Sequence, residues 1–227
     1  MITEDRQDLL DEGDLLPVDC VVPAAGCSSR MGEFKLLLPY RGRHLVTHAV
    51  RRALAVCRRV IVVTGHRAAE VEALFQRHPR ITVVRNDGYR DGGMISSIAT
   101  GAGVVASPWF FVAPGDMPEL PEPVFRRLAE AAAGDVGPGS GARTVGGSGS
   151  AAGERGGALF PVVGGRRGHP VLIARTVVDE LHRRIGDVSS MREFLDDFPT
   201  REIDVSDLVG LDEAGGIFYD IDTRSDL

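Results

Sequence analysis

The hydrophobic positions along the chain form two alternating kinds of segment. Short unbroken runs of β-branched and aromatic residues are typical of strands covered on both faces. Between them lie longer segments whose apolar residues recur every three or four positions, the pattern of a helix that buries one stripe. The predicted strands are 20–23, 60–63, 81–84, 109–113, 158–163 and 201–205. The predicted helices are 44–57, 68–75, 98–106, 121–133, 175–184 and 190–197.

Strands that alternate with helices predict an α/β fold in three layers, with a mostly parallel, twisted sheet and helices on both faces. A single core grows to roughly 250 residues before it splits, so 227 residues suit one domain, which we place at 19–227. Residues 1–18 are acidic and are expected to form a tail or linker. The Gly- and Ser-rich segment 137–157 is expected to be a flexible insertion.

Composition excludes several classes of function. A net charge of −6 argues against a nucleic-acid partner, which would require a basic face. The three cysteines, Cys20 in a strand, Cys27 in a loop and Cys57 in a helix, form no CxxC pair. This pattern fits a reducing compartment better than a zinc site or a disulfide framework. No apolar run approaches the ~20 residues that span a bilayer, so we expect a cytoplasmic protein without a membrane partner.

The segment 21–35 carries the most specific chemical pattern in the chain. It follows the first predicted strand, and Ala24, Ala25 and Gly26 have so little side chain that a ligand can lie against the backbone. Loops of this kind present several N–H groups to one anion, usually a phosphate. Arg30 and Lys35 add two cations. An arginine can bind two phosphate oxygens at once, whereas a lysine acts as a point charge. The segment therefore predicts a triphosphate-binding loop.

Better-known phosphate loops are excluded by spacing. The P-loop needs Gly-x-x-x-x-Gly-Lys-Ser/Thr, but Gly26 and Gly32 are six apart and Glu33 follows. The dinucleotide pattern Gly-x-Gly-x-x-Gly is broken at Cys27 and Ser28. A plain strand-to-helix turn would also use glycine, but the two cations favour a phosphate site.

Carboxylates at two later places suit a divalent cation. Asp116 follows a buried strand between Gly115 and a proline, a rigid position suited to Mg²⁺, which shares its coordination with phosphate oxygens. Capping of the helix near 121 is the alternative, although five residues and a proline separate them. Asp220 and Asp222 are two apart on a predicted strand, so both would face the same way and reach the same metal. A strand-end or helix cap is their alternative role.

Other polar groups stand where ligands gather. Ser96 and Ser97 precede the predicted helix 98–106, where a hydroxyl either caps the helix or meets an anion or a base edge. His66 ends a strand, where it contacts ligand or acts as a cap. His169 lies with two arginines on a loop that leads into a strand, either as a structural donor or beside a substrate.

The run Pro-Ala-Ala-Gly-x-Ser-x-Arg-Met-Gly-x-x-Lys, followed by Leu-Leu-Pro, resembles the signature of the nucleotidyltransferase family that includes molybdopterin cytidylyltransferase. It is most similar to the accessory cytidylyltransferase-like proteins of molybdenum hydroxylases. Similar motifs recur at Asn86, at Gly-Asp-Met-Pro, at Arg-x-Gly-His-Pro and at Asp-Ile-Asp-Thr, so the resemblance covers most of 19–227. An extra glycine at Gly92-Gly93 leaves the register onto Ser96 or Ser97 open, and we favour Ser97. Arg224 replaces a family proline.

The resemblance implies a nucleotide-diphospho-sugar-transferase-like, Rossmann-like fold and transfer of CMP from CTP to the phosphate of molybdopterin, with release of pyrophosphate. Ala24-Ala25 in place of Gly-Gly is similar to the cytidine-specific relatives. The implied catalytic residues are Lys35, Arg30 and Asp116. The implied nucleotide-binding residues are Ala24, Ala25, Gly26, Cys27, Ser28, Ser29, Arg30, Lys35 and Ser97. Asp116 and Asp222 would bind the metal, with Asp220 as substitute for Asp222, and His169, Arg167 and Gly168 would bind the acceptor.

The resemblance also implies Mg²⁺, or Mn²⁺ in its place, and transient contact with a molybdenum hydroxylase. The chain stops where the family begins one more helix, which would make it a domain of a longer polypeptide. Two alternatives remain open at this point. One is an enzyme of the same fold that uses a sugar phosphate or alcohol phosphate as acceptor. The other is a non-catalytic carrier that holds the molybdenum cofactor for insertion.

Overall fold

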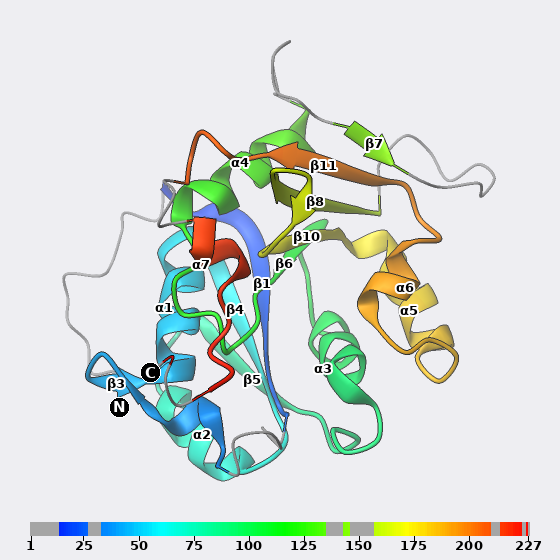
Figure 1. Ribbon diagram of the computed structural model, residues 1–227. Helices are drawn as coiled ribbons and strands as arrows, with labels where there is room; N and C mark the ends of the chain where they lie inside the picture. Colours follow the sequence, from blue (N-terminus) through cyan, green and yellow to red (C-terminus); the bar gives the residue numbers. More distant parts are fainter. Residues whose placement is uncertain are drawn as a thin grey trace.

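The computed structural model describes residues 14–26, 33–134, 143–145, 157–209, 214–223 and 226, with backbone alone at 143–145 and 214–215. Within these ranges a nine-stranded sheet crosses the molecule, and a two-stranded hairpin of β2 and β3 stands apart from it (Figure 1). The strands are β1 (Leu16–Ala24), β2 (Pro39–Tyr40), β3 (Arg43–His44), β4 (Cys57–Thr64), β5 (Ile81–Arg85), β6 (Trp109–Val112), β7 (Arg143–Val145), β8 (Ala158–Val163), β9 (Arg166–Arg167), β10 (Val171–Ala174) and β11 (Thr200–Asp204).

The strand order is β5-β4-β1-β6-β10-β8-β11-β7, with β9 paired to β8. Strands β5, β4, β1 and β6 are parallel neighbours, and β8 and β11 also pair in parallel. Strands β10, β7 and β9 pair antiparallel to their neighbours. The predicted mostly parallel sheet is confirmed.

Helices cover both faces of this sheet, as the sequence predicts. Side chains of β1 alternate between two cores: Val22 packs with α1, α2 and α4, whereas Val21 packs with α3, α5 and α6. The unbroken run 60–63 is fully buried because both of its faces are covered. The helices are α1 (Leu45–Val56), α2 (Ala68–Phe75), α3 (Gly93–Ala102), α4 (Glu122–Ala133), α5 (Val178–Arg184), α6 (Met191–Leu195) and α7 (Ala214–Phe218), with 3₁₀ turns η2 (Lys35–Leu37) and η3 (Arg175–Val177). None of the described helices is long and apolar enough to cross a membrane.

Several element boundaries differ from the prediction. Strand β1 begins at Leu16, within the predicted tail, because Leu16 pairs with Cys57 and packs on the core. Cys57 itself opens β4 instead of ending a helix. Within the predicted insertion, 143–145 form β7 at the sheet edge; residues 1–13 and the rest of the insertion up to 156 lie outside the described residues.

Two differences bear on the functional site. Helix α3 begins at Gly93, five residues before the predicted start, because the Ser96 N–H already bonds to Gly92 O at 3.2 Å. Gly93 has a φ of +58°, which suits glycine at the turn into the helix. The predicted strand near the end of the sequence is wrong: the helix α7 ends at Phe218, and residues 219–222 belong to no strand.

Asp19, near the start of β1, forms hydrogen bonds with β4 and with the loop before β6. Its side chain is buried, and its two oxygens accept hydrogen bonds from Arg59 Nε at 3.1 Å and Arg59 Nη2 at 2.7 Å. The backbone N–H groups of Ala106 and Ser107 donate to Oδ2 at 2.8 and 3.3 Å. Burial opposes ionisation, but Arg59 and the two N–H groups outweigh it, so the pKa of Asp19 is lowered.

We therefore expect Asp19→Asn to lower the free energy of unfolding at pH 7 by about 3 kcal/mol, because Arg59 would lose its carboxylate. The folded-state pKa lies below the unfolded value of about 3.9. The stabilisation is therefore present above that pH and is lost as the pH falls through the folded pKa. Urea unfolding of both proteins at pH 7 and in acid would measure this.

Glu70→Gln is the matched control, because Glu70 also pairs with an arginine, Arg67, but at an exposed position. Its unfolding midpoint should stay at the wild-type value. Equal midpoints for wild type and Asp19→Asn at pH 7 would contradict the role given to Asp19.

Candidate active site

Three charged side chains from distant parts of the chain meet at one edge of the sheet. The ammonium of Lys35 lies 2.8 Å from Asp116 Oδ2 and 3.0 Å from Asp222 Oδ1. Lys35 opens the turn η2, Asp116 follows β6, and Asp222 follows α7. The carboxyl ends of β1, β4 and β6 share this edge because these strands are parallel, and ligands in open α/β sheets gather there.

Backbone hydrogen bonds to β1 fix the position of Asp116. Beyond β6 the ladder continues with the Ala113 N–H bonded to Val21 O at 3.0 Å and the Gly115 N–H bonded to Pro23 O at 3.2 Å. A Cβ atom on Gly115 would lie 2.9 Å from Pro23 O, too close for a real side chain. Glycine at 115 therefore allows the contact that brings Asp116 beside the end of β1.

The segment that carries Asp222 is held by backbone contacts of its own. The Ile221 N–H bonds to Asp116 O at 3.1 Å, and the His169 N–H bonds to Ile217 O at 2.9 Å. Ile217 and Ile221 are both fully buried. A Cβ on Gly168 would stand 2.7 Å from Ile217 O, so the loop before β10 and this segment touch through backbone.

The electrostatics of the three charged groups favour ionisation of the lysine. Burial opposes a charge on Lys35, whose side chain is 14% exposed, but Asp116 and Asp222 outweigh this and raise the pKa of Lys35. The side chain of Asp116 is 18% exposed and that of Asp222 is 42% exposed. Asp220 is exposed, whereas Asp222 shares the Lys35 ammonium with Asp116, so of the two aspartates predicted for the metal it is Asp222 that meets Asp116.

The donor set fits a magnesium ion that also has a phosphate ligand. No group of three or more His, Cys, Asp or Glu side chains gathers around a metal position in the described part of the chain. Two carboxylates suffice for Mg²⁺, which completes its octahedron with waters and substrate phosphates. The Lys35 ammonium between Asp116 and Asp222 marks a position already suited to a cation.

The predicted acceptor loop lies against the carboxylates. His169 is half-buried, and its buried Nδ1 has no hydrogen-bond partner among the described residues. Burial lowers the pKa of His169, and the charges of Asp116 and Asp220 offset part of this. Arg167 is less open to a ligand: its guanidinium lies 4.5 Å from the Phe160 ring centroid, and its Nε donates to Glu202 Oε1 at 2.8 Å.

The first part of the predicted nucleotide loop is described only as far as Gly26. Ala24 and Ala25 are buried, and Gly26 is exposed at the end of β1. The Ala25 carbonyl already accepts the His66 N–H at 3.0 Å, and a Cβ on Gly65 would lie 2.7 Å from Ala25 Cβ. The other predicted members of the loop, Cys27, Ser28, Ser29 and Arg30, lie outside the described residues.

Ser97 does not stand at the helix start. It lies in the body of α3, is 3% exposed, and its hydroxyl oxygen accepts a hydrogen bond from Asn86 Nδ2 at 3.0 Å. Ser96 accepts from the same amide at 2.8 Å. The sequence placed the two serines before the helix because Gly92 and Gly93 hide its true start at Gly93.

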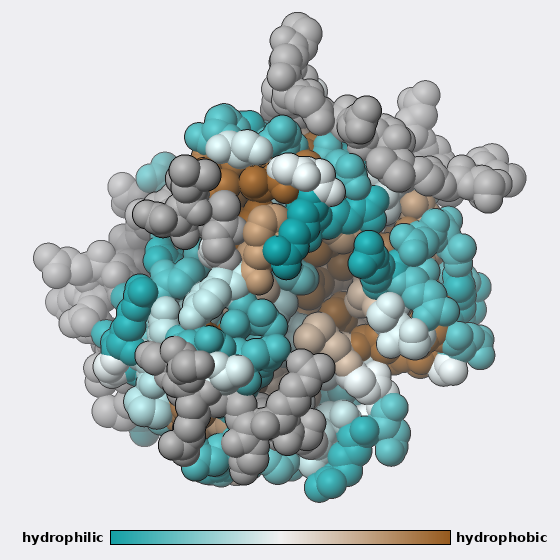
Figure 2. All heavy atoms as spheres, viewed as in Figure 1, coloured by the Kyte–Doolittle hydropathy of each residue, from teal (hydrophilic) through white to brown (hydrophobic). Residues whose placement is uncertain are grey.

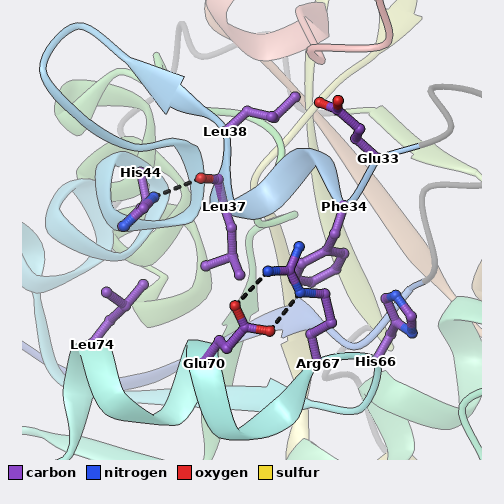
Figure 3. Close-up of a pocket in the computed structure, with 9 residues that line it drawn as sticks. All are labelled: Glu33, Phe34, Leu37, Leu38, His44, His66, Arg67, Glu70 and Leu74. Carbon is purple, nitrogen blue, oxygen red and sulfur yellow. Dashed lines mark hydrogen bonds and ion pairs between the residues drawn. The ribbon is translucent and has the colours of Figure 1, made fainter.

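A pocket of about 580 Å³ between η2 and α2 was not expected from the sequence. Phe34, next to Lys35 in the chain, forms one wall, with the His66 ring edge-on at 5.3 Å (Figure 3). The Arg67 guanidinium lies 5.9 Å from the Phe34 ring centroid and bonds to Glu70. The sequence gives His66 a capping or ligand role, but nothing in it signals the left-handed backbone of Arg67, with φ at +49°. The lining residues are Glu33, Phe34, Leu37, Leu38, His44, His66, Arg67, Glu70 and Leu74.

The surface beside the charged cluster is partly apolar. Figure 2 shows hydrophobic side chains in the hollow between α3 and the strands β8 and β10, flanked by hydrophilic ones. Arg166, in β9, places its guanidinium 4.3 Å from the Phe218 ring centroid. An acceptor with both a flat apolar part and an anionic part would find both kinds of surface here.

Comparisons with known proteins identify the family and the fold of this chain. The molybdenum cofactor cytidylyltransferase of Escherichia coli (strain K12) is 29% identical over 211 residues, which cover 92% of this chain and 93% of the relative. A nucleotidyl transferase from Methanothermobacter thermautotroptrophicus superposes with a TM-score of 0.65 at 26% identity, covering 92% of this chain and 94% of that one.

The fold is also that of Rv0371c from Mycobacterium tuberculosis H37Rv, with a TM-score of 0.66 at 24% identity, covering 93% of this chain and 96% of that one. A second structure of Rv0371c, a manganese complex, superposes with a TM-score of 0.57 at 22% identity and covers 91% and 100%. Residues 20–202 match the model of the MobA-like NTP transferase domain. Since that match takes in the strand before the glycine loop, Lys35, Asp116 and the acceptor loop, the chain belongs to the MobA-like NTP transferase family, as its motifs predicted.

Proposed function

We propose that this protein transfers CMP from CTP to the terminal phosphate of molybdopterin and releases pyrophosphate. The meeting of Lys35 with Asp116 and Asp222 at the carboxyl edge of the sheet carries the proposal. A cation and two carboxylates at this edge are what a phosphoryl-group transfer needs, since charge must be neutralised on both substrates. The similarity to a molybdenum cofactor cytidylyltransferase along almost the whole chain supports both substrates.

The reaction requires alignment more than proton transfer. A phosphate oxygen of the acceptor attacks the α-phosphorus of CTP, and pyrophosphate leaves from the opposite side. A phosphate monoester is already an ionised nucleophile, so no general base is needed. Lys35 stabilises the α-phosphate as its negative charge grows, while the exposed backbone at Gly26 and the Arg30 guanidinium hold the β- and γ-phosphates.

Asp116 and Asp222 would hold the divalent cation, Mg²⁺ or Mn²⁺. When bound, this cation supplies a positive charge that neutralises the triphosphate. The two carboxylates fit that role because they converge on one cation position, and Asp222 is open enough to share the ion with a phosphate and waters.

The choice of CTP rests on the small residues of the first loop. Ala24 and Ala25 are buried, so the base would be read by backbone near Gly26 more than by side chains. Ser97, which bonds to Asn86, would support the wall of the base site from beneath. The backbone of Gly168 and the ring of His169 border the acceptor side, with Arg167 held away by Glu202. The cytoplasmic location and transient contact with a molybdenum hydroxylase stay predictions.

Two alternatives differ in testable ways. A same-fold enzyme would use a sugar phosphate or alcohol phosphate as acceptor and would still release pyrophosphate. A carrier would bind the molybdenum cofactor without any turnover. The convergence of Lys35, Asp116 and Asp222 favours an enzyme, because a carrier needs no cation-binding carboxylate pair beside a lysine.

Radiolabelled CTP, Mg²⁺ and molybdopterin should yield pyrophosphate and a cytosine dinucleotide. Asp116→Asn should lower kcat about 100- to 1,000-fold, because the site loses one of its two carboxylates. Asp207→Asn is the control, since Asp207 pairs with Arg127 on the surface and should keep wild-type kcat. Cofactor binding without pyrophosphate in every variant would favour the carrier.

Nucleotide preference can be read from thermal stability. CTP with Mg²⁺ should raise Tm more than GTP, ATP or UTP, because the small-residue loop is proposed to accept cytosine. A tenfold preference corresponds to about 1.4 kcal/mol of additional stabilisation at equal, saturating concentrations. A larger shift with GTP would transfer the proposal to a guanylyltransferase.

Gly115→Ala should lower kcat by up to about 100-fold, because a Cβ 2.9 Å from Pro23 O would push Asp116 away from Lys35. Steady-state rates would be compared with those of Gly186→Ala, whose Cβ would meet nothing within 4 Å. Unchanged rates in both variants would mean that the position of Asp116 tolerates movement.

A further inference from the structure

The Lys35 ammonium lies where a divalent cation would lie. Its Nζ is 2.8 Å from an oxygen of Asp116 and 3.0 Å from an oxygen of Asp222. A magnesium ion bound by the same two oxygens would lie about 2.0–2.1 Å from each. An ammonium and a metal ion cannot both stand between these carboxylates, so binding of one requires the other to move.

The backbone segments that carry Asp116 and Asp222 are joined without Lys35. The Ile221 N–H bonds to Asp116 O at 3.1 Å, which places Asp222 one residue away from a direct backbone link to Asp116. Asp116 in turn follows the hydrogen bond from Gly115 to Pro23. The backbone segments that carry the two carboxylates are therefore linked by hydrogen bonds that do not involve the ammonium.

Lys35 is the member of the cluster that can move. Its ammonium is a compact charge on a flexible four-carbon stem, and the stem starts at a short 3₁₀ turn. Its side chain is only 14% exposed, and a buried charge is costly without anions close by, so the approach of a further anion would favour its departure from the two carboxylates. The triphosphate of a bound nucleotide supplies such an anion.

We propose that Lys35 is the resident counter-ion of the Asp116–Asp222 pair and gives up this place to the divalent cation when a nucleoside triphosphate takes over its ammonium. This rests on the proposed function, because it assigns the nucleotide to the same site. The nucleotide-free protein then binds free divalent cations weakly, and Lys35 couples the filling of the metal position to the arrival of substrate.

The test measures binding of Mn²⁺ without nucleotide or acceptor. Free Mn²⁺ is counted by electron paramagnetic resonance in titrations of wild type, Lys35→Met and Lys35→Arg. Lys35→Met, whose unbranched side chain reaches as far as Cε but carries no charge, should bind Mn²⁺ at least tenfold more tightly than wild type. Lys35→Arg keeps the cation and should bind as weakly as wild type. Adding Asp222→Asn to Lys35→Met should abolish the gain.

A melting experiment provides a second readout, because Lys35→Met leaves two carboxylates without their ammonium and is expected to melt lower in chelator. Mn²⁺ should raise the Tm of Lys35→Met and leave wild type unchanged. Equal Mn²⁺ affinities and equal shifts for wild type and Lys35→Met would overturn the exchange. So would tight nucleotide-free binding by wild type.

These results separate the exchange from the proposed function. Pyrophosphate release by wild type together with no Mn²⁺ gain in Lys35→Met would remove the exchange and leave the transferase. A Mn²⁺ gain that depends on Asp222, without pyrophosphate release from CTP and molybdopterin, would keep the exchange and remove the assigned reaction.

Discussion

The backbone contact between the end of β1 and the segment after β6 is the constraint on which the site depends. Parallel pairing of these strands is continued by the hydrogen bonds from Ala113 to Val21 and from Gly115 to Pro23. This continuation brings the carboxyl end of β1 and the carboxylate of Asp116 to the same edge of the sheet. The contact needs glycine at position 115, because a Cβ there would lie 2.9 Å from Pro23 O and would force the two segments apart.

The second carboxylate reaches the same point by a different route. Residues 217–222 cross the open edge of the sheet and bond by backbone to the loop before β10 and to Asp116. The Asp116–Asp222 pair is thus shared between a strand end and a segment that docks separately. Lys35 forms ion pairs with both carboxylates. It therefore connects parts of the chain that are far apart, since Lys35 and Asp222 are separated by 187 positions.

Much of the architecture follows from local sequence. Buried β-branched runs and three- and four-residue periodicity place α2 and β8 at their observed bounds, since each pattern directly reflects which face is covered. Lys35, Asp116 and Asp222 were also predicted, because their motifs are distinctive. The prediction that Asp222 lies on a strand was wrong. The start of α3 was missed because the pair Gly92-Gly93 resembles a loop in the sequence.

Local sequence could not predict which side chains pair when they are far apart in the chain. Nothing near Arg167 in the chain reveals that Glu202 holds it, and nothing near Ser97 reveals the Asn86 amide. The predicted roles of Cys27, Ser28, Ser29 and Arg30 fall outside the described residues.

In the described part of the chain every strand ends before residue 205, whereas the segment 217–222, which carries Asp222, follows the strands. A nascent polypeptide could therefore complete its sheet while still lacking the second carboxylate, so the order of synthesis would delay chemical competence until after the scaffold has formed.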